Sequence, residues 1–336
     1  MKRLSWLLGT VALVASMSCL GQASTEVPAG PVTITVRLPT PAQKVLYVHE
    51  VMPVRPGPLT LYYPKYIPGD HSPDGPIGTM MGLEIAAGGK RIARHRDEVD
   101  MFTFHLTVPA GTDRIDIRFQ FPDEDRITQQ LLDLTWDHVA LYQAGYPTKL
   151  QMYQPTLVIP ADWHYASALR TANRSGERIT FKPVLFNTLV DSPVIAGKYF
   201  RQVDLTPAGS SVHRYLAMVG DDAAAIAASD AQIADFRRLI EQAQALFHSH
   251  HYEDYHLLLV LSDHTSRDGL EHHQSSDDRA HGGTKMFADA DHFMLDGSLL
   301  PHEYTHSWNG KFRRPAELWQ PDFERPEHTR MVWVYE

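Results

Sequence analysis

The sequence contains a single cysteine among its 336 residues. Cys19 lies inside an apolar N-terminal stretch, so the chain beyond it has no thiol with which to form a disulfide. Basic side chains are also few, since 31 lysines and arginines face 40 aspartates and glutamates, for a formal net charge of -9. This acidic balance excludes the basic surface on which nucleic-acid binding depends.

Long hydrophobic runs are absent after the N-terminus, so no membrane span is expected in the mature chain. At the N-terminus, Lys2 and Arg3 precede the apolar stretch LSWLLGTVALVASMSCL, and small residues follow it. This pattern predicts a signal peptide over residues 1–23 that is cleaved after Ala23, and export to the periplasm or the medium. Two alternatives remain open, a retained N-terminal anchor and lipidation at Cys19, although the residues before this cysteine lack the expected leucine.

The first large part of the chain has the pattern of β-strands. Polar and apolar residues alternate in VTITVRL (32–38), MFTFHLTV (101–108) and RIDIRFQF (114–121), and clusters of proline and glycine separate such segments. Short strands separated by turns predict an all-β sandwich domain over residues 31–195. Such a domain serves either as a binding or spacing module or directly in the chemistry, and the pattern favours neither.

The composition changes near residue 196. Residues 229–247 place apolar side chains at helical spacing, with Ser229 as the expected N-cap. The apolar run YHLLLVL (255–261) is typical of a buried strand, and a further strand is expected around 269–272. These elements predict a mixed α/β domain over residues 196–336.

One motif in this second domain carries chemistry. His302, Glu303 and His306 form the pattern HExxH. Residues four apart share one face of a helix, so both imidazoles can reach the same metal ion, while the glutamate is placed to take a proton from a water. The alternative is two surface histidines and a solvated glutamate on an ordinary helix.

A catalytic zinc site needs a third protein ligand as well as an open position. Glu336 is available downstream, and Pro326 can begin the second helix that would carry it. A carboxylate from a helix packed beside the first would complete the site. The alternative is that Glu336 is an exposed terminal residue.

Four segments together resemble a known family. HEYTHSWNGKFRRPAEL (302–318) and RMVWVYE (330–336) resemble the zinc-site region of the glycyl aminopeptidase family of metallopeptidases. YPKYIPGD (63–70) is similar to a proline-rich motif of that family's N-terminal domain, with tyrosine in place of a tryptophan. LVDSPVIAG (189–197) resembles the family's junction between domains.

The resemblance implies a thermolysin-like peptidase domain of the gluzincin type that binds Zn²⁺. It implies His302, His306 and Glu336 as the zinc ligands and Glu303 as the general base. The family's glycine after the third ligand does not follow Glu336, and relatives continue with further helices. We therefore expect a truncated catalytic domain, with little or no activity alone and with its oxyanion stabiliser beyond Glu336.

A second segment gains meaning from the resemblance. DGLEHHQSS contains Gly269, Leu270 and Glu271, where related zinc aminopeptidases have a strand whose glutamate binds the free amine of the substrate. An extended peptide can pair with an edge strand, and a carboxylate can hold its ammonium group. The alternative is that Glu271 is an ordinary loop carboxylate.

These observations favour a zinc-dependent aminopeptidase that removes small N-terminal residues, glycine or alanine, from peptides. Two alternatives remain. One is a zinc endopeptidase in which Glu271 anchors no amine. The other is a non-catalytic exported β-domain binding protein with a vestigial zinc motif. The sequence gives no indication of the oligomeric state.

Overall fold

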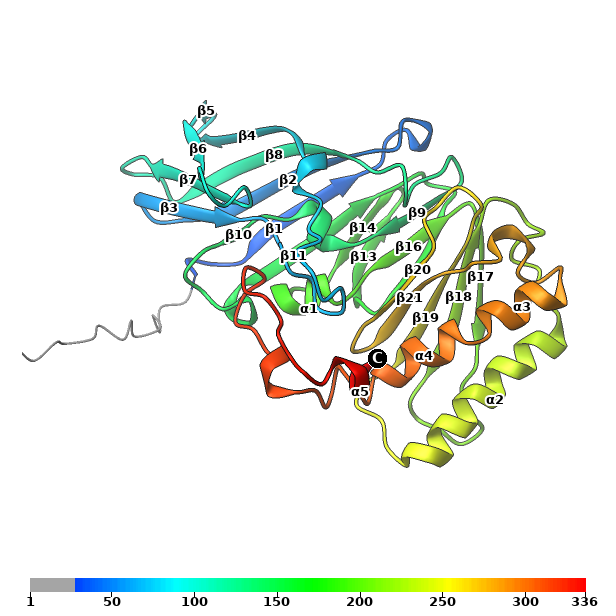
Figure 1. Ribbon diagram of the computed structural model, residues 1–336. Coiled ribbons are helices and arrows are strands. Elements are labelled where there is room, and N and C mark those ends of the chain that lie inside the picture. The colour runs from blue at the N-terminus through cyan, green and yellow to red at the C-terminus, as the bar shows by residue number, and fades with distance from the viewer. Residues whose placement is uncertain (1–27) are drawn as a thin grey trace, which may run out of the picture.

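The structure is a computed structural model that describes residues 28–336. The expected signal peptide (1–23) and Cys19 lie outside the described residues. A mostly β N-terminal domain is followed by an α/β region with few helices, as Figure 1 shows.

Two sheets form the body of the N-terminal domain. The larger sheet has the strand order β13-β14-β11-β1-β2-β8-β4-β5, with β15 beside β11. Its strands are β1 Val32–Arg37, β2 Val45–Pro53, β4 Met81–Ala87, β5 Lys90–Arg91, β8 Arg114–Pro122, β11 Met152–Val158, β13 Thr171–Ser175, β14 Arg178–Phe181 and β15 Val184–Leu185. The smaller sheet has the order β10-β3-β7-β6 and consists of β3 Gly57–Tyr62, β6 Arg94–Arg96, β7 Thr103–Val108 and β10 Tyr142–Gln143.

The predicted strands form for the reason that the alternation suggested. In β8, Ile115, Ile117, Phe119 and Phe121 are buried, while the residues between them are more exposed. These side chains share one hydrophobic core with side chains of the smaller sheet, such as Phe104. The sandwich is not purely antiparallel, because β1 pairs with β11 in parallel.

A small sheet of order β12-β16-β9 joins the two domains, with β9 Leu131–Leu134, β12 His164–Ser167 and β16 Val194–Gly197. The second domain is built on a sheet of order β17-β18-β19-β21-β20. Its strands are β17 Tyr199–Asp204, β18 Arg214–Gly220, β19 Tyr255–Leu261, β20 Asp268–Glu271 and β21 Ser275–Arg279. Strand β20 lies at the edge and pairs only with β21 among the described strands.

Five α-helices are described, and the largest three cover one face of the second sheet (Figure 1). They are α1 Phe186–Val190, α2 Asp230–Phe247, α3 Ala290–Asp296, α4 Leu299–His306 and α5 Val332–Tyr335. Short 3-10 turns occupy η1 Pro41–Gln43, η2 Ile77–Thr79, η3 Trp136–Val139, η4 Thr148–Leu150, η5 Gly283–Lys285 and η6 Ala316–Leu318. Helix α2 begins with a capping box in which Ser229 accepts a hydrogen bond from the backbone of Gln232, as predicted.

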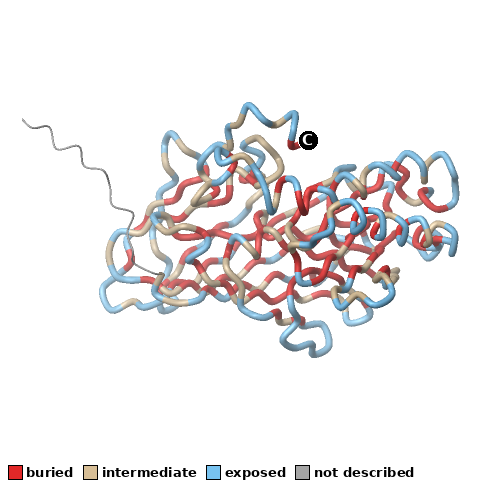
Figure 2. Tube along the Cα trace, turned by 90° about the horizontal axis from the view of Figure 1, so that it is seen from below, coloured by how far each residue is buried: buried red, intermediate tan, exposed pale blue. Residues whose placement is uncertain are grey.

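The continuous apolar run of β19 is explained by burial on both faces. Leu257, Leu259 and Leu261 belong to the core shared with α2 and α4. Leu258 and Val260 instead face the small sheet that joins the domains. In Figure 2, buried residues run through the strands of both domains and exposed residues gather on the loops.

The helix expected from Pro326 does not form. Only Val332–Tyr335 is helical, and residues 326–330 are irregular. The carbonyl of Pro326 accepts a hydrogen bond from the side-chain amide of Gln320, which lies in the preceding loop. In a helix this carbonyl would instead accept from the backbone of the following turn. No helix in residues 28–336 is long and apolar enough to cross a membrane.

Candidate functional site

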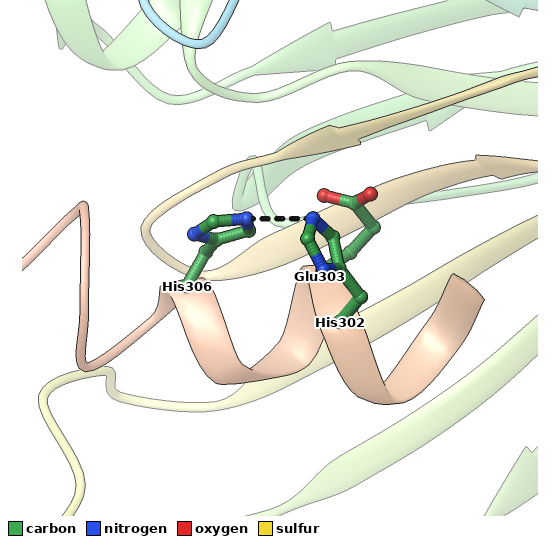
Figure 3. A group of neighbouring side chains, drawn as sticks. All are labelled: His302, Glu303 and His306. Atoms are coloured by element: carbon green, nitrogen blue, oxygen red, sulfur yellow. Dashed lines mark hydrogen bonds between the residues drawn. The ribbon is translucent and has the colours of Figure 1, made fainter. Parts of the chain in front are cut away.

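Helix α4 presents the HExxH motif against the edge of the second sheet. Leu300 and Tyr304 are buried on its inner face, and the hydroxyl of Tyr304 lies 2.6 Å from that of Tyr252. His302 and His306 share one side of the helix, and Figure 3 shows both rings on the side that faces the neighbouring strands. The packing of the apolar face therefore fixes the direction in which the two imidazoles point.

The two histidines present the same ring atom to a common point. Their Nε2 atoms are 3.1 Å apart (Figure 3). The Nδ1 atom of His306 lies 2.9 Å from the carbonyl oxygen of Asn309, which can only accept, so this nitrogen carries the proton. The Nε2 lone pair of His306 is consequently free to bind a cation.

Glu336 reaches the same point from the other end of the fold. Its Oε2 atom is 3.4 Å from Nε2 of His302 and 3.6 Å from Nε2 of His306. Gly310 makes this approach feasible, since a Cβ there would collide with the ring of the neighbouring Tyr335. The structure therefore brings together the three predicted ligand atoms, although α5 is much shorter than expected.

Glu303 is buried beneath β20. A Cβ at Gly269 would collide with its carboxylate, so the glycine creates the space that the side chain occupies. Burial raises the pKa of Glu303 to about 9, and the negative charges of Asp278 and Glu271 act in the same direction. One carboxyl oxygen of Glu303 lies within 4.8 Å of a ring nitrogen of each histidine, close enough to share a water with them.

The strand expected around residues 269–272 is β20, and it holds all three residues singled out there. Glu271 ends the strand and is buried, and Leu270 is buried beside it. Tyr335 donates a hydrogen bond to the carboxylate of Glu271. The ammonium group of Lys311 lies 3.9 Å from the same carboxylate. Glu271 is thus a partnered carboxylate inside the site rather than a loop residue.

Lys311 links this carboxylate to the N-terminal domain. Its ammonium group is 3.3 Å from Asp191. Burial favours the neutral amine, but Asp191 and Glu271 outweigh it and raise the pKa of Lys311, so the group stays charged. A cavity of about 380 Å³ between the domains lies beside Lys311 and does not include the two histidines of α4 among its lining residues.

Lys311, Tyr335 and His71 contact the carboxylates of the site and were not foreseen, and His71 is the one from the N-terminal domain. His71, in the loop after β3, places its Nε2 atom 2.8 Å from Oε1 of Glu336. The motif at residues 63–70 stops directly before it and is the nearest signal in the sequence. The N-terminal domain therefore contributes a side chain to the site. The strand pattern alone did not indicate whether this domain takes part in the site.

Two family models match separate parts of the chain. Residues 33–198 match the model described as the peptidase M61 N-terminal domain, and residues 296–336 match that of the M61 glycyl aminopeptidase. A comparison with the curated protein sequences found no match.

Solved structures share the fold at low sequence identity. An aminopeptidase N family protein from Idiomarina loihiensis superposes with a TM-score of 0.78 at 18% identity, over 91% of this chain and 52% of that one. An M1 zinc metallopeptidase from Deinococcus radiodurans gives a TM-score of 0.50 at 13% identity, over 89% of this chain and 67% of that one. The chain thus spans about half the length of the first of these structures.

Proposed function

The chain belongs to the M61 glycyl aminopeptidase family of peptidases, and from this premise we propose that the whole protein is a zinc-dependent aminopeptidase acting on peptides with N-terminal glycine or alanine. The observation that carries the proposal is the convergence of His302, His306 and Glu336. Their three ligand atoms are separated by 3.1, 3.4 and 3.6 Å. Around a tetrahedral zinc ion with bonds near 2.1 Å, neighbouring ligand atoms are about 3.4 Å apart.

The donor set also suits zinc chemically. Two neutral imidazoles and one carboxylate are the protein ligands of glutamate-type zinc peptidases, and the fourth position stays open for water. A zinc ion held there would supply a Lewis acid that lowers the pKa of that water and polarises the scissile carbonyl. Its positive charge would also favour the ionised form of Glu303, against the burial that raises the pKa of this group.

Glu303 acts as the general base in this proposal. Its carboxylate takes the proton of the attacking water and passes it to the amine that leaves when the peptide bond breaks. Its position beneath Gly269 puts it between the edge strand and the two imidazoles, where a bound substrate would present its scissile bond. No other carboxylate of α4 is available for this role.

Substrate binding is assigned to β20. Its free edge can pair with an extended peptide, and Glu271 at its end can hold the substrate's ammonium group. Because the distance between Glu271 and the zinc is fixed, a peptide whose ammonium group is held by Glu271 would present only its first peptide bond to the zinc. The engagement of Glu271 with Tyr335 and Lys311 is the observation that favours the second candidate, an endopeptidase in which no amine is anchored.

Metal content tests the proposal directly. Purified protein is expected to contain about one zinc per chain by inductively coupled plasma mass spectrometry. The variant His306→Ala should lose the metal, whereas His105→Ala, which removes a histidine of the N-terminal sandwich, should keep it. A wild-type protein without stoichiometric zinc would instead be a non-catalytic binding protein with a vestigial motif.

Acetylation of the substrate separates the two peptidase candidates. An aminopeptidase should cleave alanyl or glycyl peptides and fail to cleave the same peptides once their N-termini are acetylated. An endopeptidase should cleave both. Equal rates on both substrates would therefore overturn the amine-binding role of Glu271.

We also propose that the protein is exported, on the basis of the N-terminal pattern of residues 1–23. N-terminal sequencing of protein recovered from the periplasm or medium should begin at Ser24. A mature protein that keeps Lys2 and Arg3 would support the retained anchor instead.

A further inference from the structure

We propose that His71 of the N-terminal domain is a positioning residue for the metal site, and that it orients Glu336 as a zinc ligand. This inference rests on the proposed function, because it assumes that Glu336 binds zinc. In Figure 1 the blue loop that follows β3 descends toward the end of the chain marked C, where α4 and α5 meet. The domain that precedes the HExxH motif would thereby complete the metal centre.

The two oxygens of the Glu336 carboxylate face different partners. Oε2 faces the imidazoles of His302 and His306 at 3.4 and 3.6 Å, and Oε1 lies 2.8 Å from Nε2 of His71. A carboxylate only accepts, so His71 donates through Nε2–H. The hydrogen bond to Oε1 prevents the carboxylate from rotating, and it thereby keeps Oε2 directed toward the two histidines.

Ring packing holds His71 in place. Its ring meets that of Tyr335 edge-on, at 5.4 Å between centroids and an interplanar angle of 89°. Tyr335 in turn packs against His306 at 4.9 Å. Two of the residues around the metal position therefore share a single tyrosine as their neighbour, which couples their orientations.

The loop is shaped to bring His71 this close. Gly69 has a φ of +111°, and a Cβ there would lie 2.6 Å from Leu270 and 2.7 Å from Glu271, so only glycine lets the loop approach β20. His71 itself has a φ of 54°, in the left-handed region that non-glycine residues rarely adopt. A backbone conformation of this kind persists where the surrounding contacts require it.

Contacts of the residues just before this turn fix the loop to the second domain. The ammonium group of Lys311 donates to the carbonyl of Pro68 at 3.3 Å. The backbone nitrogens of Lys65 and Tyr66 both donate to the carbonyl of Phe323, at 3.1 and 2.8 Å. These hydrogen bonds attach the loop to the segment between α4 and α5. They therefore keep His71 within hydrogen-bonding distance of Glu336.

Hydrogen bonds from outside the ligand set raise metal affinity, and their loss typically costs about 10- to 100-fold in binding. The side chain of Glu336 is 35% exposed, so without His71 little else restrains it. We therefore expect the affinity for zinc, rather than the ability to fold, to depend on this contact.

The test compares two replacements of His71. His71→Asn suits the left-handed backbone but is too short to reach Glu336, whereas His71→Gln keeps a donor at similar reach. Metal-free protein is titrated with zinc in competition with a chromophoric chelator. His71→Asn should raise the zinc dissociation constant about 10- to 100-fold, and His71→Gln should keep most of the affinity.

His49→Ala is the matched control, because His49 makes a similar hydrogen bond to Asp116 at 2.7 Å far from the metal position. The thermal midpoints of metal-free wild type and His71→Asn should agree, while the increase on adding zinc should be smaller in the variant. The inference would be overturned if His71→Asn bound zinc as tightly as wild type. It would also be overturned if His71→Asn and His71→Gln lost zinc affinity to the same extent. If His306→Ala also left zinc uptake unchanged, the proposed function itself would fail.

Discussion

Arg126 of the N-terminal domain and Asp277 of the second domain form a buried ion pair, with 2.9 Å between the guanidinium and the carboxylate. Arg126 also contacts Asp133, so one cation serves carboxylates from both domains. Burial opposes ionisation of Asp277, but Arg126 and Arg279 outweigh it and lower the pKa of this group. The pair ties the sandwich to strand β21, directly beside the edge strand of the site.

Removing the cation should be costly. Arg126→Ala would leave two buried carboxylates with Arg279 as their remaining cation, and we expect a loss of about 3–5 kcal/mol in the free energy of unfolding. The control is Arg118→Ala, which breaks a pair with Asp116 whose arginine is 55% exposed and should cost about 0–1 kcal/mol. Urea denaturation measures both, and similar losses would contradict the special role of Arg126.

Glu50 predicts a pH dependence of stability. Its buried carboxyl accepts a hydrogen bond from the backbone of Leu141, but burial raises its pKa from 4.5 to about 8. Between these values the folded protein holds a proton that the unfolded chain releases, so stability falls as the pH rises from about 4.5 to 8. The expected loss is roughly 3–5 kcal/mol.

Glu50→Gln should remove this part of the pH dependence, since the amide keeps an acceptor and never ionises. The variant is expected to be more stable than wild type at pH 8, with the difference shrinking toward pH 4.5. Exposed Glu84→Gln should leave the wild-type curve unchanged. Parallel curves for wild type and Glu50→Gln would contradict burial as the cause.

Glu303→Gln separates metal binding from proton transfer. The amide cannot accept the proton of the attacking water, so the kcat of the whole protein should fall by about 100- to 10,000-fold. Zinc content should remain near one per chain, because the ligand atoms are unchanged. Exposed Glu317→Gln is the control and should keep full activity. Substantial peptidase activity in Glu303→Gln would assign the base to another group.

Gly69 and Gly57 allow strain and crowding to be distinguished. Both have strongly positive φ values, +111° and +119°, but only Gly69 is crowded, by Leu270 and Glu271. Gly57→Ala should cost about 1–2 kcal/mol of stability through its backbone alone. Gly69→Ala should cost more and should also weaken zinc binding, because the loop must withdraw from β20. Equal zinc affinity in the two variants would contradict the close approach.

Local patterns were sufficient to predict the elements whose structure is decided locally. The bounds of β19 match the apolar run, and α2 begins at the predicted cap, because burial and capping depend on neighbouring residues. The spacing of His302 and His306 likewise determines their common face. The prediction of a helix from Pro326 was wrong, because a proline that can begin a helix does not supply the tertiary contacts that stabilise one.

The remaining parts of the site depend on contacts between distant segments. Glu336 was first considered as an available downstream carboxylate, and only the resemblance of its flanking residues to a family assigned it as the third ligand. His71 was missed because the left-handed turn that delivers it follows from packing against β20 and Lys311, which no local pattern encodes. Glu271 was placed on the correct strand, but its contact with Tyr335 could not be anticipated.

The hydrogen bond between His71 and Glu336 joins residues 265 positions apart. Closing a segment of this length carries an entropic cost that is met only as other native contacts form, so we expect this hydrogen bond to form late in folding. Early intermediates should consequently hold zinc only through the adjacent pair on α4, weakly and exchangeably. High-affinity zinc binding would then report that folding is complete. When the protein refolds after dilution from denaturant, high-affinity zinc binding should appear later than the β-sheet content.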